Sequence, residues 1–188
     1  VNNNTAFTTG VNLPYGNVEI NWNAGGNWPQ SLTGTVVLTA GNFTITSLGN
    51  ASNELRLTPA SNGTALVLGI NGDLTVTSGV LSMVGGGGNG NKDCDINVKG
   101  NVNIAGTIDM NSANNSNGSI ALNVAGNFSL TGTGLLKNTA GNGSRTVNFN
   151  NQDSIQLFSS TATGINTSSI TFNAGTASST NTLKLQSN

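Results

Sequence analysis

Hydrophobic and polar residues alternate along much of the chain in short runs. The clearest runs are Ile96-Asn97-Val98, Val102-Asn103-Ile104, Ile120 to Val124, Phe128-Ser129-Leu130 and Ile155-Gln156-Leu157. A period of two places alternate side chains on one face, so each run predicts a β-strand with one buried face. No window has the sustained i, i+3, i+4, i+7 spacing of an amphipathic helix. The pattern therefore predicts an all-β protein.

The runs recur as a cassette. A glycine, then Asn or Asp, then apolar-polar-apolar begins at Gly41, Gly72, Gly100 and Gly126, which are 31, 28 and 26 residues apart. A looser fifth copy begins at Asp153, 27 residues after Gly126. Apolar residues stand four and two positions before the last three glycines. A third apolar segment and a polar stretch of variable length complete each unit.

A unit of 26 to 31 residues cannot bury its own apolar face, whereas stacked units share a continuous core. The repeat therefore predicts a parallel β-helix (β-solenoid) with three short strands per coil, whose successive coils pair in parallel about 4.8 Å apart. A β-sandwich and a propeller fit less well, because neither repeats a three-strand cassette of this length. All the variable stretches should fall at one corner.

The Gly-Asn pair is predicted to form another corner of each coil. The glycine would supply a backbone shape that a Cβ disfavours, and the Asn or Asp would bond nearby backbone. Asn residues repeated at this corner could also stack into an amide ladder.

The ends of the chain differ from its middle. Residues 1–31 carry both tryptophans, the only tyrosine and two of the three prolines, and they are predicted to form a cap, with solenoid repeats in 32–188. Trp22 and Trp28 then either cover the first coil or offer a stacking platform for sugar rings. Residues 170–172 and 183–185 predict further strands with little to block edge pairing, so the last coil is expected to be covered by further chain or by another subunit.

Composition excludes several kinds of chemistry. The 188 residues include only six Lys+Arg and seven Asp+Glu, no histidine and one cysteine, while Asn (33), Gly (26), Thr (24) and Ser (19) make up more than half. The commonest general base and metal ligand is therefore missing, and no disulfide can form within the chain. Neither a basic face for nucleic acid nor a membrane-spanning apolar run is present. No cofactor is expected.

Candidate sites are few. Asp93 and Asp95, after a Gly/Asn-rich stretch, could hold Ca²⁺ through oxygen ligands. The alternative is a solvated acidic loop end, and if a strand begins at Asp93, Cys94 points inward. A polysaccharide-active enzyme would need clustered carboxylates, but the acids are scattered and Glu54 with Arg56 suggests a solvated pair.

Outward threonines raise the question of a flat ice-binding face. Thr44, Thr46, Thr75 and Thr77 partly align, but the next coil places Asn103 and Ala105 at these positions. The interrupted row makes ice binding a minor alternative.

The cassette resembles repeats of very large secreted surface proteins of Bacteroidota. The matching residues are Leu122 to Leu130, Thr146 to Gln152, and Gly26-Asn27-Trp28-Pro29 leading to Phe43-Thr44-Ile45. The resemblance, over roughly 26–160, implies export to the cell surface or medium, a stalk or adhesin role, and no catalysis. Asp153-Ser154-Ile155 also resembles a Bacteroidota O-glycosylation sequence, and Ser154 would face outward if Ile155 and Leu157 face inward.

The sequence thus favours a non-catalytic structural or adhesive β-solenoid module, extracellular or at the cell surface. Its expected partners are other subunits or further chain of the same protein, and surface glycans. A glycan-binding module is the main alternative, and a polysaccharide-active enzyme is a lesser one.

Overall fold

The computed structural model describes residues 16–22, 30–31, 37–59, 65–85, 93–113, 117–140, 142–151, 155–162, 169–175 and 182–187. These residues form three parallel sheets. The six-stranded sheet contains β3 (Val37–Ala40), β6 (Leu66–Ile70), β9 (Cys94–Val98), β12 (Ile120–Val124), β15 (Arg145–Phe149) and β17 (Thr171–Ala174). The seven-stranded sheet contains β1 (Val18–Trp22), β4 (Phe43–Leu48), β7 (Leu74–Val76), β10 (Val102–Ile104), β13 (Phe128–Leu130), β16 (Ile155–Ser160) and β18 (Thr182–Ser187). The five-stranded sheet contains β2 (Gln30–Ser31), β5 (Glu54–Pro59), β8 (Val80–Gly85), β11 (Thr107–Asn111) and β14 (Leu135–Lys137).

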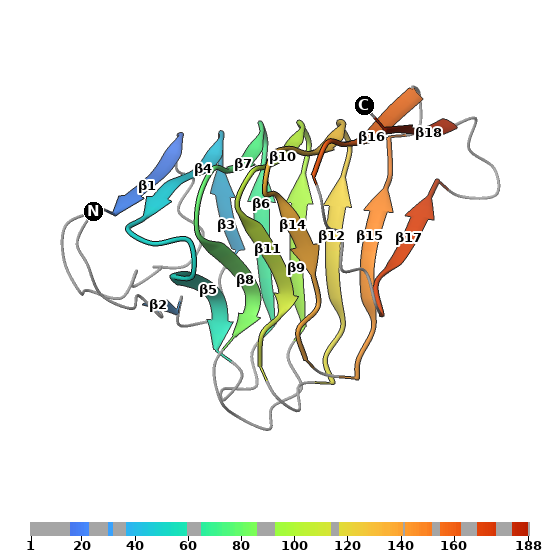
Figure 1. Ribbon diagram of the computed structural model, residues 1–188. Coiled ribbons are helices and arrows are strands. Elements are labelled where there is room, and N and C mark those ends of the chain that lie inside the picture. The colour runs from blue at the N-terminus through green and yellow to red at the C-terminus, as the bar shows by residue number, and fades with distance from the viewer. Residues whose placement is uncertain are drawn as a thin grey trace.

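The chain visits the six-, seven- and five-stranded sheets in turn, and each strand pairs in parallel with its counterpart in the next coil. Figure 1 shows the coils stacked side by side, from blue β1 to red β18. The predicted all-β solenoid with three strands per coil is confirmed. The variable stretches all connect a strand of the five-stranded sheet to one of the six-stranded sheet, as predicted.

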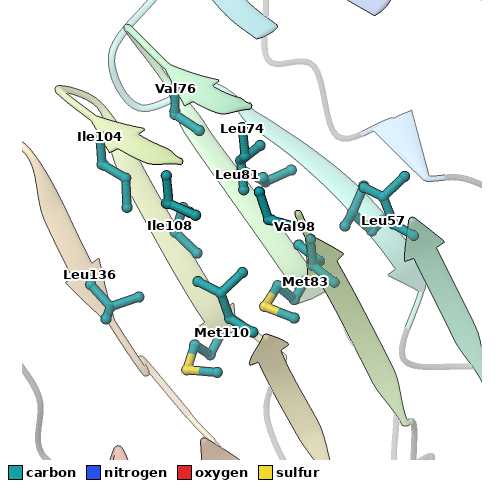
Figure 2. Close-up of a cluster of buried hydrophobic side chains, with 14 of the residues drawn as sticks. Leu57, Leu74, Val76, Leu81, Met83, Val98, Ile104, Ile108, Met110 and Leu136 are labelled. Atoms are coloured by element: carbon teal, nitrogen blue, oxygen red, sulfur yellow. The ribbon is translucent and has the colours of Figure 1, made fainter. Parts of the chain in front are cut away.

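The core consists of columns of in-register apolar residues. In the seven-stranded sheet Leu74 pairs with Val102, which pairs with Phe128, and all three are fully buried. The intervening Thr75, Asn103 and Ser129 are half-buried on the outer face. The expected columns and their outward partners are therefore present. Figure 2 shows the neighbouring part of the core, where the flexible side chains of Met83 and Met110 fill the space between Leu57 and Leu136.

The corner glycines are required for a different reason from the predicted one. Positive φ values occur at other glycines, such as Gly79 and Gly132, and not at Gly72, Gly100 or Gly126. A Cβ on Gly126 would instead collide with the Gly100 carbonyl group and lie 2.8 Å from Asn101 Oδ1. The glycines therefore allow successive corners to approach closely enough for the Gly126 N–H to bond the Gly100 carbonyl at 2.9 Å.

The Asn and Asp residues of this corner link coils through the backbone. The Asn42 side-chain oxygen accepts the Asp73 N–H at 2.8 Å, and Asp73 Oδ1 accepts the Asn101 N–H at 2.6 Å. Asn101 and Asn127 repeat the pattern one coil further on each time. We call this series the corner ladder. It joins a side chain to the next coil's backbone, so the predicted amide-to-amide stacking is wrong for this corner.

An amide-to-amide ladder lies on the outer face of the six-stranded sheet instead. The Nδ2 of Asn123, Asn148 and Asn173 donates to the Oδ1 of the preceding Asn at 2.8, 2.7 and 2.8 Å, starting from Asn97. We call these four residues the amide ladder. It begins at Asn97 because the paired residue in the preceding coil is Gly69, which has no side chain.

The fifth copy of the cassette is shifted by three residues from its predicted place. Phe158, not Ile155, pairs with Phe128, and the two rings stack with centroids 5.3 Å apart. Ile155 is 53% exposed and Leu157 is half-buried, so the prediction that both face inward is wrong. Gln156 is buried where earlier coils have glycine, and its Nε2 donates to the Val124 and Gly126 carbonyls.

Two segments within residues 1–31 belong to the sheets. β1 pairs in parallel with β4, and β2 pairs with β5, so the stack extends one coil before Val37. Residues 1–15 and 23–29 lie outside the described part, and the cap stays a prediction for them.

Candidate functional site

The outer face of the five-stranded sheet gathers charged residues from four successive strands. Pairing aligns Arg56 with Ser82, Ser82 with Asp109, and Asp109 with Lys137. We call this line the charged row. Each member follows the inward apolar residue of its strand, so the row arises directly from the coil register. The sequence contained this signal, which becomes visible when the third segments of the coils are aligned.

One end of the charged row is tied to Glu54 on the same strand. Arg56 Nε and Nη2 each approach Glu54 Oε2 at 2.8 Å. The other Glu54 oxygen accepts a hydrogen bond from Ser112 Oγ, which lies 2.9 Å from the buried Ser82 Oγ. Glu54 therefore bridges β5 to the end of β11 across β8, and the predicted solvated pair is part of a larger network.

The other end of the row centres on Asp109, whose side chain is only 2% exposed. Its Oδ1 accepts the Asn111 and Thr139 N–H groups at 3.1 Å each. Its Oδ2 accepts Thr139 Oγ1 at 2.5 Å and pairs with Lys137 Nζ at 3.3 Å. Four donors occupy the two oxygens, and these bonds hold three successive segments of chain together.

This arrangement is suited to structure rather than to acid–base catalysis. A general acid or base needs an oxygen that reaches substrate, but the Asp109 oxygens are buried and occupied, and both Glu54 oxygens are bonded. The described residues also contain no group of three acidic or cysteine side chains that could hold a metal ion. The charged row thus links coils much as the two Asn ladders do.

The aspartates predicted as weak metal ligands flank the start of β9. Asp93 is exposed, Asp95 is half-buried and Cys94 between them is fully buried, so the predicted alternation is confirmed. Asp93 Oδ1 accepts the Ser119 N–H at 2.7 Å, which links two coils. Burial raises the pKa of the Cys94 thiol far above its ordinary value, so this cysteine should be unreactive.

We expect chelation with EDTA to change the melting temperature of the chain by less than about 1 °C. The two aspartates bring only two carboxylates, and one already accepts a backbone N–H. If they held Ca²⁺ at a hundredfold excess over Kd, its removal would cost about 2.7 kcal/mol, or roughly 5–10 °C for a chain of this size. A shift of that size, reversed by added Ca²⁺, would establish Asp93 and Asp95 as ligands.

Asp95→Asn should stabilise the chain at neutral pH. Burial, and secondly the charge of Asp93, raise the pKa of Asp95 above its value in the unfolded chain. The carboxyl therefore favours folding below its ordinary pKa and loses that contribution as the pH rises through the raised pKa. Thermal melts of both proteins from acid to neutral pH should show a higher melting temperature for the variant at pH 7, with the difference vanishing in acid. A lower melting temperature at pH 7 would contradict this.

The remaining predicted site residues are placed only in part. Trp22 is half-buried and packs against the core, and its carbonyl lies 3.3 Å from Ser47 Oγ. This position fits the covering role better than a sugar platform. Trp28 and Ser154 lie outside the described residues. The condition for an outward Ser154, inward Ile155 and Leu157, is not met.

The outer face of the seven-stranded sheet carries the predicted threonines. Thr44 pairs with Thr75, and the same position is Asn103, then Ser129, in the next coils. Ser129 Oγ donates to Asn103 Oδ1 at 3.1 Å. The position is thus polar in each of these coils, but its residue type changes, as the sequence indicated.

Comparison with family models, with curated proteins and with solved structures finds no match to this chain. The part of the chain that the structure describes includes no helix long and apolar enough to cross a membrane.

Proposed function

We propose that this chain is a non-catalytic structural or adhesive β-solenoid module of an exported bacterial surface or extracellular protein. The observation that carries the proposal is the use made of its polar side chains. The corner ladder, the amide ladder and the charged row all bond one coil to the next. A chain that commits its polar groups to holding a long stack together is suited to act as a rigid spacer or display surface.

The expectation of export rests on the sequence resemblance and on the composition. Few charges and many Asn, Thr and Ser residues are typical of the repeats that the cassette resembles. Protease treatment of intact cells that produce the protein tests location. Peptides of this chain should appear in the medium without lysis. Peptides released only after lysis would overturn the proposal.

The absence of catalysis is tested on the purified chain. Incubation with a panel of acidic and neutral polysaccharides should produce no new reducing ends and no unsaturated products above the buffer background. Turnover of any of them would overturn the non-catalytic assignment. Glu54→Gln would then show whether the charged row is responsible, provided that its melting temperature stays close to that of the parent chain.

Glycan binding is the alternative for the same fold. A glycan array probed with the chain and with Trp22→Ala separates the two functions. A structural module gives no glycan signal that depends on Trp22, whereas a signal lost in the variant would favour the glycan-binding alternative.

A further inference from the structure

The two ends of the solenoid bury their apolar residues to different extents. One core column runs through Phe128, Phe158 and Leu185 in register. Phe128 is fully buried, Phe158 is half-buried and Leu185 is 77% exposed. At the opposite end, Ile20 of β1 is only 6% exposed. The first described coil is therefore closed over its core, and the last is open.

A second column has the same outcome. Val147 of β15 is fully buried, whereas its partner Phe172 of β17 is 36% exposed. Together with Ile155, these residues are the exposed large hydrophobic side chains of the described chain, and all belong to β16, β17 and β18. In every earlier coil the equivalent positions are covered by the next coil, so this surface has the composition of an interior coil-to-coil interface.

Polar bonding also continues to this end. Asn173 donates to Asn148 at 2.8 Å, and its own Oδ1 occupies the position that accepts from the next coil elsewhere in the amide ladder. β17 and β18 are the last described strands of their sheets, so each presents one unpaired edge. Lys184 is the only charged residue among the described residues of β16 to β18 and of the segments that adjoin them. Apolar side chains, unpaired edges and little charge together favour strand pairing.

We propose that the open end formed by β17 and β18 binds the same end of a second copy of this chain, around a two-fold axis. A head-to-tail contact would need the opposite end to be open, but Ile20 is buried there. A two-fold contact covers both open ends at once and closes, so it yields a dimer rather than a filament. Because the axis reverses the strand direction, the edge strands of the two copies meet antiparallel. This inference does not depend on the proposed function.

Sedimentation of the purified chain over a wide concentration range tests the stoichiometry. The chain should form a discrete dimer, and Leu185→Glu should raise the dimer Kd by about 100-fold, because a charge would enter an apolar contact. Thr131→Glu is the matched control, since it adds the same charge at an exposed position in the middle of the stack. Both variants should melt like the parent at concentrations where it is monomeric. A monomer at all concentrations, or a dimer insensitive to Leu185→Glu, would overturn the proposal.

Amine cross-linking tests the orientation independently. The only lysines are Lys92, Lys99, Lys137 and Lys184, so residues 1–91 have none. In a mixture of isotopically light and heavy chains, the two-fold arrangement should give mixed Lys184–Lys184 cross-links. A link from Lys184 to the amino group of Val1, or sedimentation of ever longer oligomers, would indicate head-to-tail assembly and overturn the two-fold contact.

Discussion

Replacing Gly126 with alanine should destabilise the chain by about 3 kcal/mol, although it adds only one methyl group. The new Cβ would meet the Gly100 carbonyl group of the preceding coil, closer than the 3.0 Å that real Cβ atoms keep. This carbonyl accepts the Gly126 N–H at 2.9 Å, so relief of the clash must lengthen a bond between coils. The melting temperature should fall by roughly 6–12 °C.

Gly16→Ala is the control for this substitution. Gly16 occupies the equivalent corner of the first described coil, its φ is not positive, and an added Cβ would meet no atom within 4 Å. We expect its stability to be unchanged or higher by about 0.5 kcal/mol, because alanine restricts the unfolded chain. Equal losses for both variants would show that glycine is required for its backbone conformation and not for the approach of the coils.

Phe128→Ala should cost about 4 kcal/mol, the largest effect expected from a single core truncation here. The Phe128 ring is fully buried, stacks on Phe158 at 5.3 Å and meets the edge of Phe149 at 6.3 Å. Its removal leaves a cavity between two sheets and two coils. Denaturant unfolding followed by circular dichroism measures the loss.

Two further variants separate the cavity from other effects. Phe128→Leu retains most of the volume and should cost less than about 1.5 kcal/mol. Ser129→Ala, at the next residue on the outer face, removes one hydrogen bond to Asn103 and should cost about 1 kcal/mol or less. A loss for Phe128→Ala no larger than that for Ser129→Ala would contradict the described packing.

The columns of the seven-stranded sheet were predictable because each coil repeats the same alternation at nearly the same spacing. A one-residue slip would move every apolar side chain to the outer face, so the register of Leu74, Val102 and Phe128 had no competing solution. Where the repeat is weaker, the same reasoning failed. Ile155-Gln156-Leu157 has the required alternation, but Phe158 offers a ring that stacks on Phe128, and the gain in aromatic packing decides the register.

The corners show a second limit of sequence reasoning. Gly-Asn is a common turn sequence, and its local preferences suggested that Gly126 was needed for its dihedral angles. In the stack, the space between coils decides instead, and the Asn101 side chain bonds the backbone of the next coil and not its own turn. Contacts between residues 26 positions apart have no local signature in the chain.

The charged row was missed for a related reason. Arg56, Ser82, Asp109 and Lys137 differ in chemistry, so they do not register as a repeat, and the acids were counted as scattered along the chain. The pairing of β5, β8, β11 and β14 brings them into one line. Alignment of the coils by their inward residues, rather than by sequence identity, would have found the row.

Parallel, in-register stacking also accounts for the unusual composition. Any outward position recurs about every 4.8 Å along the stack, so a charge written into the repeat would face its own copy in the next coil. Two like charges at that spacing repel by about 1 kcal/mol even in water, and the cost grows with every added coil. An amide at the same position bonds its copy, as Asn123 bonds Asn97.

The few charges that the chain retains follow this rule. Asp73 stands between Asn42 and Asn101 in the corner ladder, where its neighbours are neutral. Asp109 lies next to Lys137, a charge of opposite sign. A protein built by repeating one coil can thus lengthen without accumulating self-repulsion only if its repeated surface is neutral, and 13 charged residues in 188 meet that condition.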